Sequence, residues 1–298
     1  MDNLELDKII LGTAALGGVW GKVDAEESVQ TIYESLACGI SALDTAPAYG
    51  DAEYFIGQAL AQWKGKRPHI STKVGRSKSY EATEAYYDYS TLALQRSVEQ
   101  SLATLGVSHV DLLFLHDPAA LTVDQAARVL ADMQSFKDQG LTKKIGIGGN
   151  PPDWFKPFLA DGQFDVLMEY NKLNACNIDA LESTIPACRE NNMEYYAASP
   201  LNMGLLGSQF QAFSKTIPHW LDRSSVEQAR RIAAIAERHE LPLDNLSLRF
   251  LFSIPASFKI VMGAGNKTQL RGSLEAIQQG TLPEDVYNEI LQTFNDNR

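Results

Sequence analysis

Short apolar stretches alternate with longer stretches of helical periodicity along nearly the whole chain. Eight apolar stretches have the length and the β-rich composition of buried strands: residues 8–12, 40–44, 69–73, 110–116, 144–148, 164–169, 194–198 and 258–263. Between and after them, helical patterns cover residues 53–60, 90–105, 122–139, 154–159, 178–191, 226–239, 267–279 and 284–294, and a further helix begins at Asp24 and stops at Gly39. Strand and helix signals therefore follow one another in regular order.

Residues typical of helix ends support this division. Asp24 with Glu27, and Thr122 with Gln125, have the spacing of capping boxes at helix N-termini. Glycines follow the helical patterns at positions 39, 106 and 140, where a left-handed residue can end a helix. The boundaries of the strongest helices are thus predicted from both ends.

Strands that alternate with helices pair in parallel through right-handed crossovers, and eight such strands close a barrel. The alternative, an open doubly wound sheet, places a dinucleotide on a GxGxxG turn after its first strand. Here GTAALGG follows that strand, and the later GIGGNP at 146–151 fails because Asn150 and Pro151 interrupt the motif. We found no internal repeat and no linker, so the sequence predicts one (β/α)8 TIM-barrel domain over residues 1–298.

Composition narrows the possible partners. A formal net charge of −11 disfavours nucleic acid and anionic membranes, which need a basic face. The first residues lack the pattern of a signal peptide, and no apolar run reaches the ~18 residues that span a bilayer. Cys38, Cys176 and Cys188 are scattered and are typical of reduced cysteines. We therefore expect a cytoplasmic protein, monomeric or homodimeric, that acts on a small molecule.

Three chemically active residues lie where predicted strands end. Asp44, Lys73 and His116 close the second, third and fourth strands, and Tyr49 follows Asp44 by five residues. In a barrel the chemistry lies at these carboxyl ends. A free phenol has a pKa of ~10, which a neighbouring ammonium lowers. Lys73 can supply that charge if Asp44 holds it.

The same residues suit a redox reaction on a carbonyl or alcohol. Tyr49 can exchange a proton, and His116 can donate a hydrogen bond to the substrate oxygen. No side chain carries hydride, so a nicotinamide cofactor is needed. Taken singly, Asp44 and Tyr49 are more often a helix cap or a packing residue, and a structural role is at least as frequent for Lys73 and His116; their joint placement carries the interpretation. A metal hydrolase lacks support, because no HxH or paired-carboxylate cluster lies at the strand ends, and no metal site is expected.

The segments LDTAPAYG at 43–50, STKVG at 71–75 and GVSHVDLLFLHDP at 106–118 resemble the signature regions of the aldo-keto reductase superfamily. The similarity continues through KKIGIGGN at 143–150, ASPLNMGLL at 198–206 and VMGAGNKTQLRGSLEA at 261–276. The resemblance implies a (β/α)8 barrel that uses NAD(P) and an Asp-Tyr-Lys-His tetrad. It places those four roles on Asp44, Tyr49, Lys73 and His116.

The resemblance also implies a set of cofactor contacts across the barrel mouth. They are Gly12, Thr13, Asp44, Gly149, Asn150, Ser199, Pro200, Leu201, Met203, Gly204, Gly263, Ala264, Gly265, Asn266, Gln269 and Ser273. Ordinary turn chemistry is the alternative role for the glycines among them.

Five positions depart from the family pattern. Ala198 stands where most relatives stack an aromatic ring on the nicotinamide, and Ser273 replaces a usual asparagine on the adenine side. Gly263, Gly265 and Gln269 stand where NADP-preferring relatives place cations. A 2′-phosphate needs charge-assisted bonds, so NAD is the expected cofactor, although Lys267 and Arg271 are nearby in sequence.

The ASPLNMGLL segment with Ala198 most resembles the branch of the family that contains L-galactose, L-fucose (D-threo-aldose) and pyridoxal dehydrogenases. This implies oxidation of an aldose at C1 to a lactone, with Tyr49 as the base and hydride transfer to NAD+. Tyr49, His116, Trp20 and Trp220 are the expected substrate contacts, with His219 as a further candidate for the substrate rim. For Trp20, Trp220 and His219 loop packing is the alternative.

Two other functions stay open at this point. One is an NADPH-dependent reductase of aldehydes or ketones. The other is a nucleotide-binding barrel that serves as a regulatory subunit, against which the intact tetrad argues.

Overall fold

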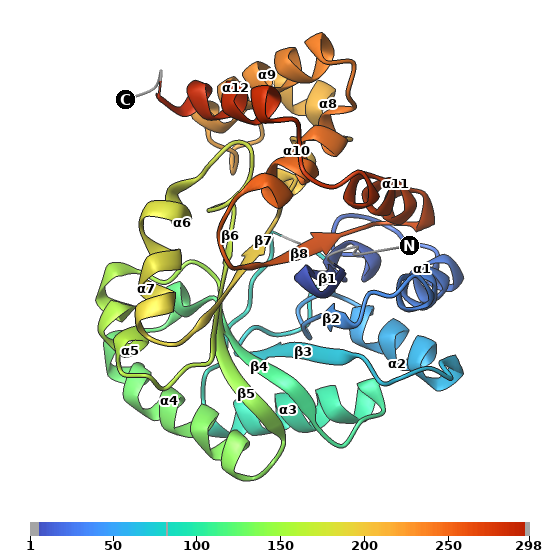
Figure 1. Ribbon diagram of the computed structural model, residues 1–298. Coiled ribbons are helices and arrows are strands. Elements are labelled where there is room, and N and C mark those ends of the chain that lie inside the picture. Colours follow the sequence, from blue (N-terminus) through green and yellow to red (C-terminus); the bar gives the residue numbers. More distant parts are fainter. Residues whose placement is uncertain (1–5, 82, 296–298) are drawn as a thin grey trace.

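Eight parallel strands close into a barrel in sequence order (Figure 1), in a computed structural model that describes residues 6–81 and 83–295. The strands are β1 (Ile9–Gly12), β2 (Ala42–Asp44), β3 (His69–Val74), β4 (Val110–His116), β5 (Thr142–Gly148), β6 (Val166–Tyr170), β7 (Glu194–Ala198) and β8 (Lys259–Gly263). Each strand pairs with the next, and β8 pairs with β1. The predicted barrel is confirmed, with strand bounds shifted by two residues or fewer.

Helices surround the barrel on its outside (Figure 1). They are α1 (Ala25–Ala37), α2 (Ala52–Gln62), α3 (Thr91–Leu105), α4 (Val123–Asp138), α5 (Lys156–Ala160), α6 (Asp179–Glu182), α7 (Thr184–Glu190), α8 (Phe210–Lys215), α9 (Arg223–Arg238), α10 (Leu243–Ser253), α11 (Lys267–Gln278) and α12 (Glu284–Asn295). Short 3-10 turns are η1 (Leu6–Lys8), η2 (Ala14–Leu16), η3 (Pro118–Ala120), η4 (Asp153–Phe155) and η5 (Asn202–Gly204). Within 6–81 and 83–295, no helix has the length and apolar character needed to cross a membrane.

The helical pattern at 178–191 was predicted as one helix, and the structure divides it into α6 and α7 at Ser183. Pro186 lies in the first turn of α7. A proline lacks the N–H of a helix interior and disfavours helical backbone before it, so it begins a new helix. The short α8 and the buried α10 were not predicted. The apolar residues of α10 cover most of its surface, so they leave no clear stripe.

Alternation along β4 separates two apolar clusters. Leu112 and Phe114 join residues of β1, β6, β7 and β8 in a cluster that lies inside the barrel. Leu113 and Leu115 belong to the larger cluster between the strands and the helices. Because side chains of a strand alternate between its two faces, His116 lies on the same inner side as Leu112 and Phe114.

The loops after β1 and β2 approach each other so closely that one position allows no side chain. The carbonyl of Gly17 accepts a hydrogen bond of 3.0 Å from the N–H of Asp51. A Cβ atom on Gly17 would lie 1.7 Å from the carbonyl oxygen of Tyr49. Gly17 thus fixes the loop that carries Tyr49 against the loop that follows β1.

We predict that Gly17→Ala destabilises the protein by about 1–3 kcal/mol, because the added methyl forces two backbone segments apart. Gly272→Ala is the matched control. A Cβ on Gly272, inside α11, meets no heavy atom within 4 Å. Replacing a helical glycine by alanine stabilises by up to about 1 kcal/mol. Urea denaturation followed by circular dichroism measures both changes, and equal midpoints for Gly17→Ala and wild type would contradict the prediction.

Candidate active site

The four predicted catalytic residues come from adjacent elements at the carboxyl end of the barrel. Asp44 ends β2, Lys73 is the penultimate residue of β3, and His116 ends β4. Tyr49 lies between β2 and α2. Asp44, Lys73 and His116 are buried, whereas Tyr49 is partly exposed. The structure therefore brings together all four.

Lys73 and Asp44 form an ion pair inside the barrel. The Lys73 Nζ atom lies 2.9 Å from Asp44 Oδ1 and 2.7 Å from Asp44 Oδ2, and it donates to the Thr45 carbonyl at 2.9 Å. The Ser71 hydroxyl donates to Asp44 Oδ1 at 2.8 Å. Burial lowers the pKa of Lys73, but Asp44 and Tyr49 raise it by more, so the net shift is upward and Lys73 stays charged.

Tyr49 lies between this cation and the imidazole of His116. The Lys73 Nζ atom is 4.8 Å from the centre of the Tyr49 ring, and the rings of Tyr49 and His116 meet edge to face with centres 5.8 Å apart. Burial raises the pKa of Tyr49, Lys73 lowers it, and Asp44 raises it again, with a net upward shift. Lys73 therefore acts in the predicted direction, but burial outweighs it. The phenol is protonated at neutral pH.

His116 is neutral. Burial and the charges of Lys73 and Arg76 hold its pKa well below the ordinary range. Its Nδ1 atom has no hydrogen-bond partner among the described residues, while its Nε2 atom lies 3.9 Å from the Asp117 carboxylate. A neutral imidazole carries one proton, and the nearby negative charge favours its placement on Nε2. His116 then presents an N–H donor on the side of Nε2.

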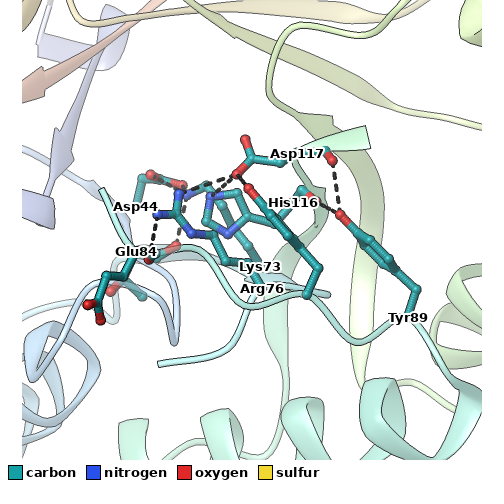
Figure 2. Close-up of polar contacts among 9 residues, drawn as sticks. Asp44, Lys73, Arg76, Glu84, Tyr89, His116 and Asp117 are labelled. Carbon is teal, nitrogen blue, oxygen red and sulfur yellow. Dashed lines mark hydrogen bonds and ion pairs between the residues drawn. The ribbon is translucent and has the colours of Figure 1, made fainter. Parts of the chain in front are cut away.

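A group of residues beside His116 was not predicted from the sequence. Asp117 follows His116, and its Oδ2 atom accepts from the Tyr87 hydroxyl at 2.8 Å and pairs with Arg76 Nη1 at 3.3 Å. The Tyr89 hydroxyl donates to the carbonyls of His116 and Asp117 at 2.7 and 2.9 Å. Figure 2 shows Arg76, Tyr89, His116 and Asp117 gathered around these contacts.

One signal for this group was visible in the sequence: Asp117 follows His116 in the HDP segment. Its partners Arg76, Tyr87 and Tyr89 come from the connection between β3 and α3, where no periodic pattern exists. Their position beside Asp117 depends on how that connection folds over the strand ends.

Of the predicted cofactor residues at the ends of β1 and β8, Gly263 leaves open space, whereas a Cβ on Gly12 would lie 3.0 Å from Val261 Cγ1. Gly12 and Gly263 are in register in these paired strands, and a Cβ on Gly263 would meet no heavy atom within 4 Å. Thr13 follows, and its hydroxyl donates to the Asp44 carbonyl at 2.9 Å. The open space at Gly263, at the carboxyl end of β8, fits the close approach of a dinucleotide, so the residues present suit the expected cofactor.

The predicted residues after β5 and β7 have special backbone conformations. Gly149 has φ 141°, and among non-glycine residues Ser199 and Met203 have φ 59° and 56°. The Ser199 hydroxyl donates to the Met203 sulfur at 3.3 Å. The side-chain amide of Asn150 bonds to the backbone N–H and carbonyl of Tyr170, at 3.1 and 3.2 Å.

The start of α11 is already capped by its own side chains. Asn266 Oδ1 accepts from the N–H of Gln269 at 2.9 Å, and Gln269 Oε1 accepts from the N–H of Gly265 at 2.8 Å. Arg271 binds Glu34 of α1 through two contacts of 2.5 and 2.9 Å. Arg271 is therefore engaged with a carboxylate.

The aromatic residues predicted for the substrate rim are exposed, and in the described part of the chain no hydrogen bond, ion pair or ring contact joins them to the four central residues. Trp20 is 55% and Trp220 is 45% exposed, and the Trp220 ring packs on Phe213 with centres 5.5 Å apart. His219 is exposed as well. In the described part of the chain, no three His, Cys, Asp or Glu side chains form a group that could hold a metal ion.

Comparisons with known proteins agree with this geometry. The model of the aldo/keto reductase family matches residues 8–293. L-galactose dehydrogenase of Arabidopsis thaliana is 27% identical over 287 residues, which cover 93% of this chain and 86% of that protein. NADH-specific methylglyoxal reductase of Escherichia coli is 25% identical, covering 92% and 91%. D-threo-aldose 1-dehydrogenase of a Pseudomonas species is 26% identical, covering 92% and 90%.

Solved structures of similar proteins have the same fold. An aldo-keto reductase of Bacillus halodurans superposes with a TM-score of 0.76 at 22% identity, covering 96% of this chain and 91% of that one. Glycerol dehydrogenase of Gluconobacter oxydans gives a TM-score of 0.75 at 22% identity, covering 96% and 90%. With the family model matched over most of the chain, this protein belongs to the aldo/keto reductase family and is an NAD(P)-dependent oxidoreductase.

Proposed function

We propose that the enzyme oxidises an aldose at C1 to its lactone, with Tyr49 as the general base and NAD+ as the hydride acceptor. The observation that carries this proposal is the Tyr49 phenol beside a lysine that is ion-paired with Asp44. One group can then give or take a proton while a fixed cation stabilises its anionic form.

Each central residue has a separate task in this reaction. His116 donates its Nε2 hydrogen to the reacting oxygen and orients it. Tyr49 as phenolate takes the hydroxyl proton in the oxidation, and as phenol it returns a proton in the reverse reduction. Lys73, held by Asp44, stabilises the phenolate. The nicotinamide, when bound, supplies the hydride acceptor.

The names of several relatives support a sugar as the substrate. L-galactose dehydrogenase, D-threo-aldose 1-dehydrogenase and a D-arabinose 1-dehydrogenase of Saccharomyces cerevisiae resemble this chain at 26–27% identity. A second candidate is the reduction of small aldehydes, since a methylglyoxal reductase is equally similar. The protonated state of Tyr49 at neutral pH favours that direction.

For the cofactor we propose NAD. Gly263, Gly265 and Gln269 bring no cation to the start of α11, and Arg271 is bound by Glu34. The carboxylate of Glu34 also repels a 2′-phosphate. We propose that the cofactor lies over Gly12, Gly263 and the loop at 199–204, with its nicotinamide near Tyr49.

We predict that Tyr49→Phe lowers kcat by about 10²–10⁴-fold, because the proton donor and acceptor is lost. Binding of NADH, followed by fluorescence, stays within a factor of three. Tyr54→Phe, at a 53% exposed position, is the matched control and keeps wild-type kcat. A wild-type protein that binds NADH and turns over no aldose or aldehyde would instead support the regulatory-subunit alternative.

The kcat values of reduction and of oxidation should depend on pH in opposite ways. Reduction needs the protonated phenol, whose pKa is raised mainly by burial, so its kcat stays level through neutral pH and falls only under alkaline conditions. Oxidation needs the phenolate, so its kcat rises with pH across the same range. In Lys73→Gln the lowering effect of the cation is lost, and the rising limb of oxidation moves to higher pH. Profiles measured with wild type and Lys73→Gln check this, and an oxidation rate independent of pH would contradict it.

We predict that Glu34→Gln increases kcat/KM for NADP+ by roughly 10-fold, because Arg271 is released to form a charge-assisted bond with the 2′-phosphate. The value for NAD+ should change little. Glu26→Gln, at an exposed position of the same helix, is the control. Steady-state kinetics with both cofactors give the ratio, and an unchanged ratio in Glu34→Gln would place the 2′-phosphate away from Arg271.

A further inference from the structure

A carboxylate stands beside the hydrogen-bond donor of the proposed reaction. The Oδ2 atom of Asp117 lies 3.9 Å from Nε2 of His116, and the Asp117 side chain is 20% exposed. Because His116 is neutral, this contact is not an ion pair. The distance is also too long for a direct hydrogen bond. Asp117 is thus close to the atom that meets the substrate oxygen, and its function is not explained by a bond to His116.

The carboxylate is held firmly in that position. Arg76 and Tyr87 both contact its Oδ2 atom. The Tyr87 ring stacks on Tyr89 with centres 5.9 Å apart and planes 11° apart, and Tyr89 fixes the backbone of residues 116 and 117. Burial and the Asp117 charge raise the pKa of Tyr87, so its hydroxyl remains a donor. Arg76 and Tyr87 hold the side chain of Asp117, and Tyr89 holds its backbone, so the carboxylate is preorganised.

Asp117 has capacity for one more hydrogen bond. An ionised carboxylate only accepts, and its two oxygens offer about four lone-pair positions. Tyr87 and Arg76 use Oδ2, and no described residue donates to Oδ1. Oδ1 lies close to Gly149, the residue after β5. A Cβ added to Gly149 would be 3.1 Å from Oδ1, so the glycine leaves this oxygen without a covering side chain.

We propose that Asp117 accepts a hydrogen bond from a hydroxyl on the carbon next to the reacting carbon, so that the enzyme selects α-hydroxy carbonyl compounds and the sugars that contain this group. This rests on the proposed function, which places the reacting oxygen at His116. Oxygens on neighbouring carbons are about one hydrogen-bond length apart, and the Asp117 carboxylate lies 3.9 Å from Nε2 at its Oδ2 atom, so a hydroxyl beside the reacting carbon can reach this carboxylate when the reacting oxygen accepts from Nε2.

The proposal predicts an order among three aldehydes of similar size. Lactaldehyde carries a hydroxyl on the neighbouring carbon and can donate to Asp117. Propanal has no group there. Methylglyoxal has a carbonyl oxygen, which can only accept and which therefore faces a carboxylate without a shared proton. In NADH-dependent reduction, wild-type kcat/KM should favour lactaldehyde over propanal.

The test compares wild type, Asp117→Asn and two controls with these three aldehydes. An asparagine keeps the shape but replaces one acceptor by a donor. We expect the lactaldehyde-to-propanal ratio of kcat/KM to fall by about 10- to 100-fold, the loss typical of a hydrogen bond to a charged group. Relative to propanal, methylglyoxal should improve in Asp117→Asn. Any loss that arises because the Asp117 charge no longer favours the Nε2 proton of His116 is common to the three aldehydes and cancels from these ratios.

Tyr87→Phe and Asp161→Asn are the controls. Tyr87→Phe removes one bond that holds Asp117 but leaves the carboxylate and the Arg76 contact, so the preference for lactaldehyde should persist. Asp161 is an exposed carboxylate after α5, and its replacement should change nothing. Thermal denaturation shows whether each variant is folded.

Three results would overturn the assignment. Equal losses for all three aldehydes in Asp117→Asn would mean that Asp117 acts only through His116 or through the connection between β3 and α3. A raised KM for NADH without a change in aldehyde preference would assign the carboxylate to the cofactor. A wild type that does not distinguish lactaldehyde from propanal would remove the α-hydroxyl contact yet leave the oxidoreductase intact. The proposed function itself would be wrong only if wild type turned over no aldehyde and no aldose with either cofactor.

Discussion

The ion pair between Asp44 and Lys73 is the interaction on which the site depends. Two charges inside a barrel cost desolvation energy that their attraction only partly offsets, so such a pair is a poor means of gaining stability. Here both carboxylate oxygens contact the ammonium, and Thr45 and Ser71 complete the shell. The arrangement makes sense as a means of fixing a positive charge beside the phenol of Tyr49. The neighbouring loops, including the contact at Gly17, keep that phenol in place.

The sequence predicted the strands and the three central residues on them, Asp44, Lys73 and His116, for one physical reason. A buried strand alternates its faces, and its carboxyl end lies at the mouth of the barrel. His116 comes two residues after Phe114, so it lies on the same inner face of the barrel and nearer to the barrel mouth. Lys73 is in register with Phe114 on the adjacent strand, so it reaches the same layer. These positions follow from the two-residue alternation of each strand and from the pairing register between strands, and both are determined by the sequence.

Other features depend on contacts that no local pattern encodes. The ammonium of Lys73 was expected to lower the pKa of Tyr49, but burial outweighs this attraction, and the degree of burial follows from the surrounding loops. The contacts of Asp117 with Arg76 and Tyr87 join residues some 30–41 positions apart through an irregular connection. Likewise, α10 was missed because a helix enclosed by barrel and neighbouring helices shows little amphipathic contrast.

Backbone strain is concentrated on the same face as the chemistry. Among the described non-glycine residues with positive φ, Asp117, Asn171 and Ser199 directly follow strands β4, β6 and β7, and Asn202 and Met203 lie in η5 of the loop after β7. The other two, Asn192 and Glu240, come just after helices, where left-handed residues are common. Left-handed backbone is unfavourable for these side chains and persists only where surrounding contacts impose it. For Asp117, those contacts are the Tyr89 hydroxyl and the Arg76 and Tyr87 side chains. Left-handed backbone is thus concentrated at the barrel mouth, and the contacts that hold Asp117 in this conformation also hold its carboxylate beside His116.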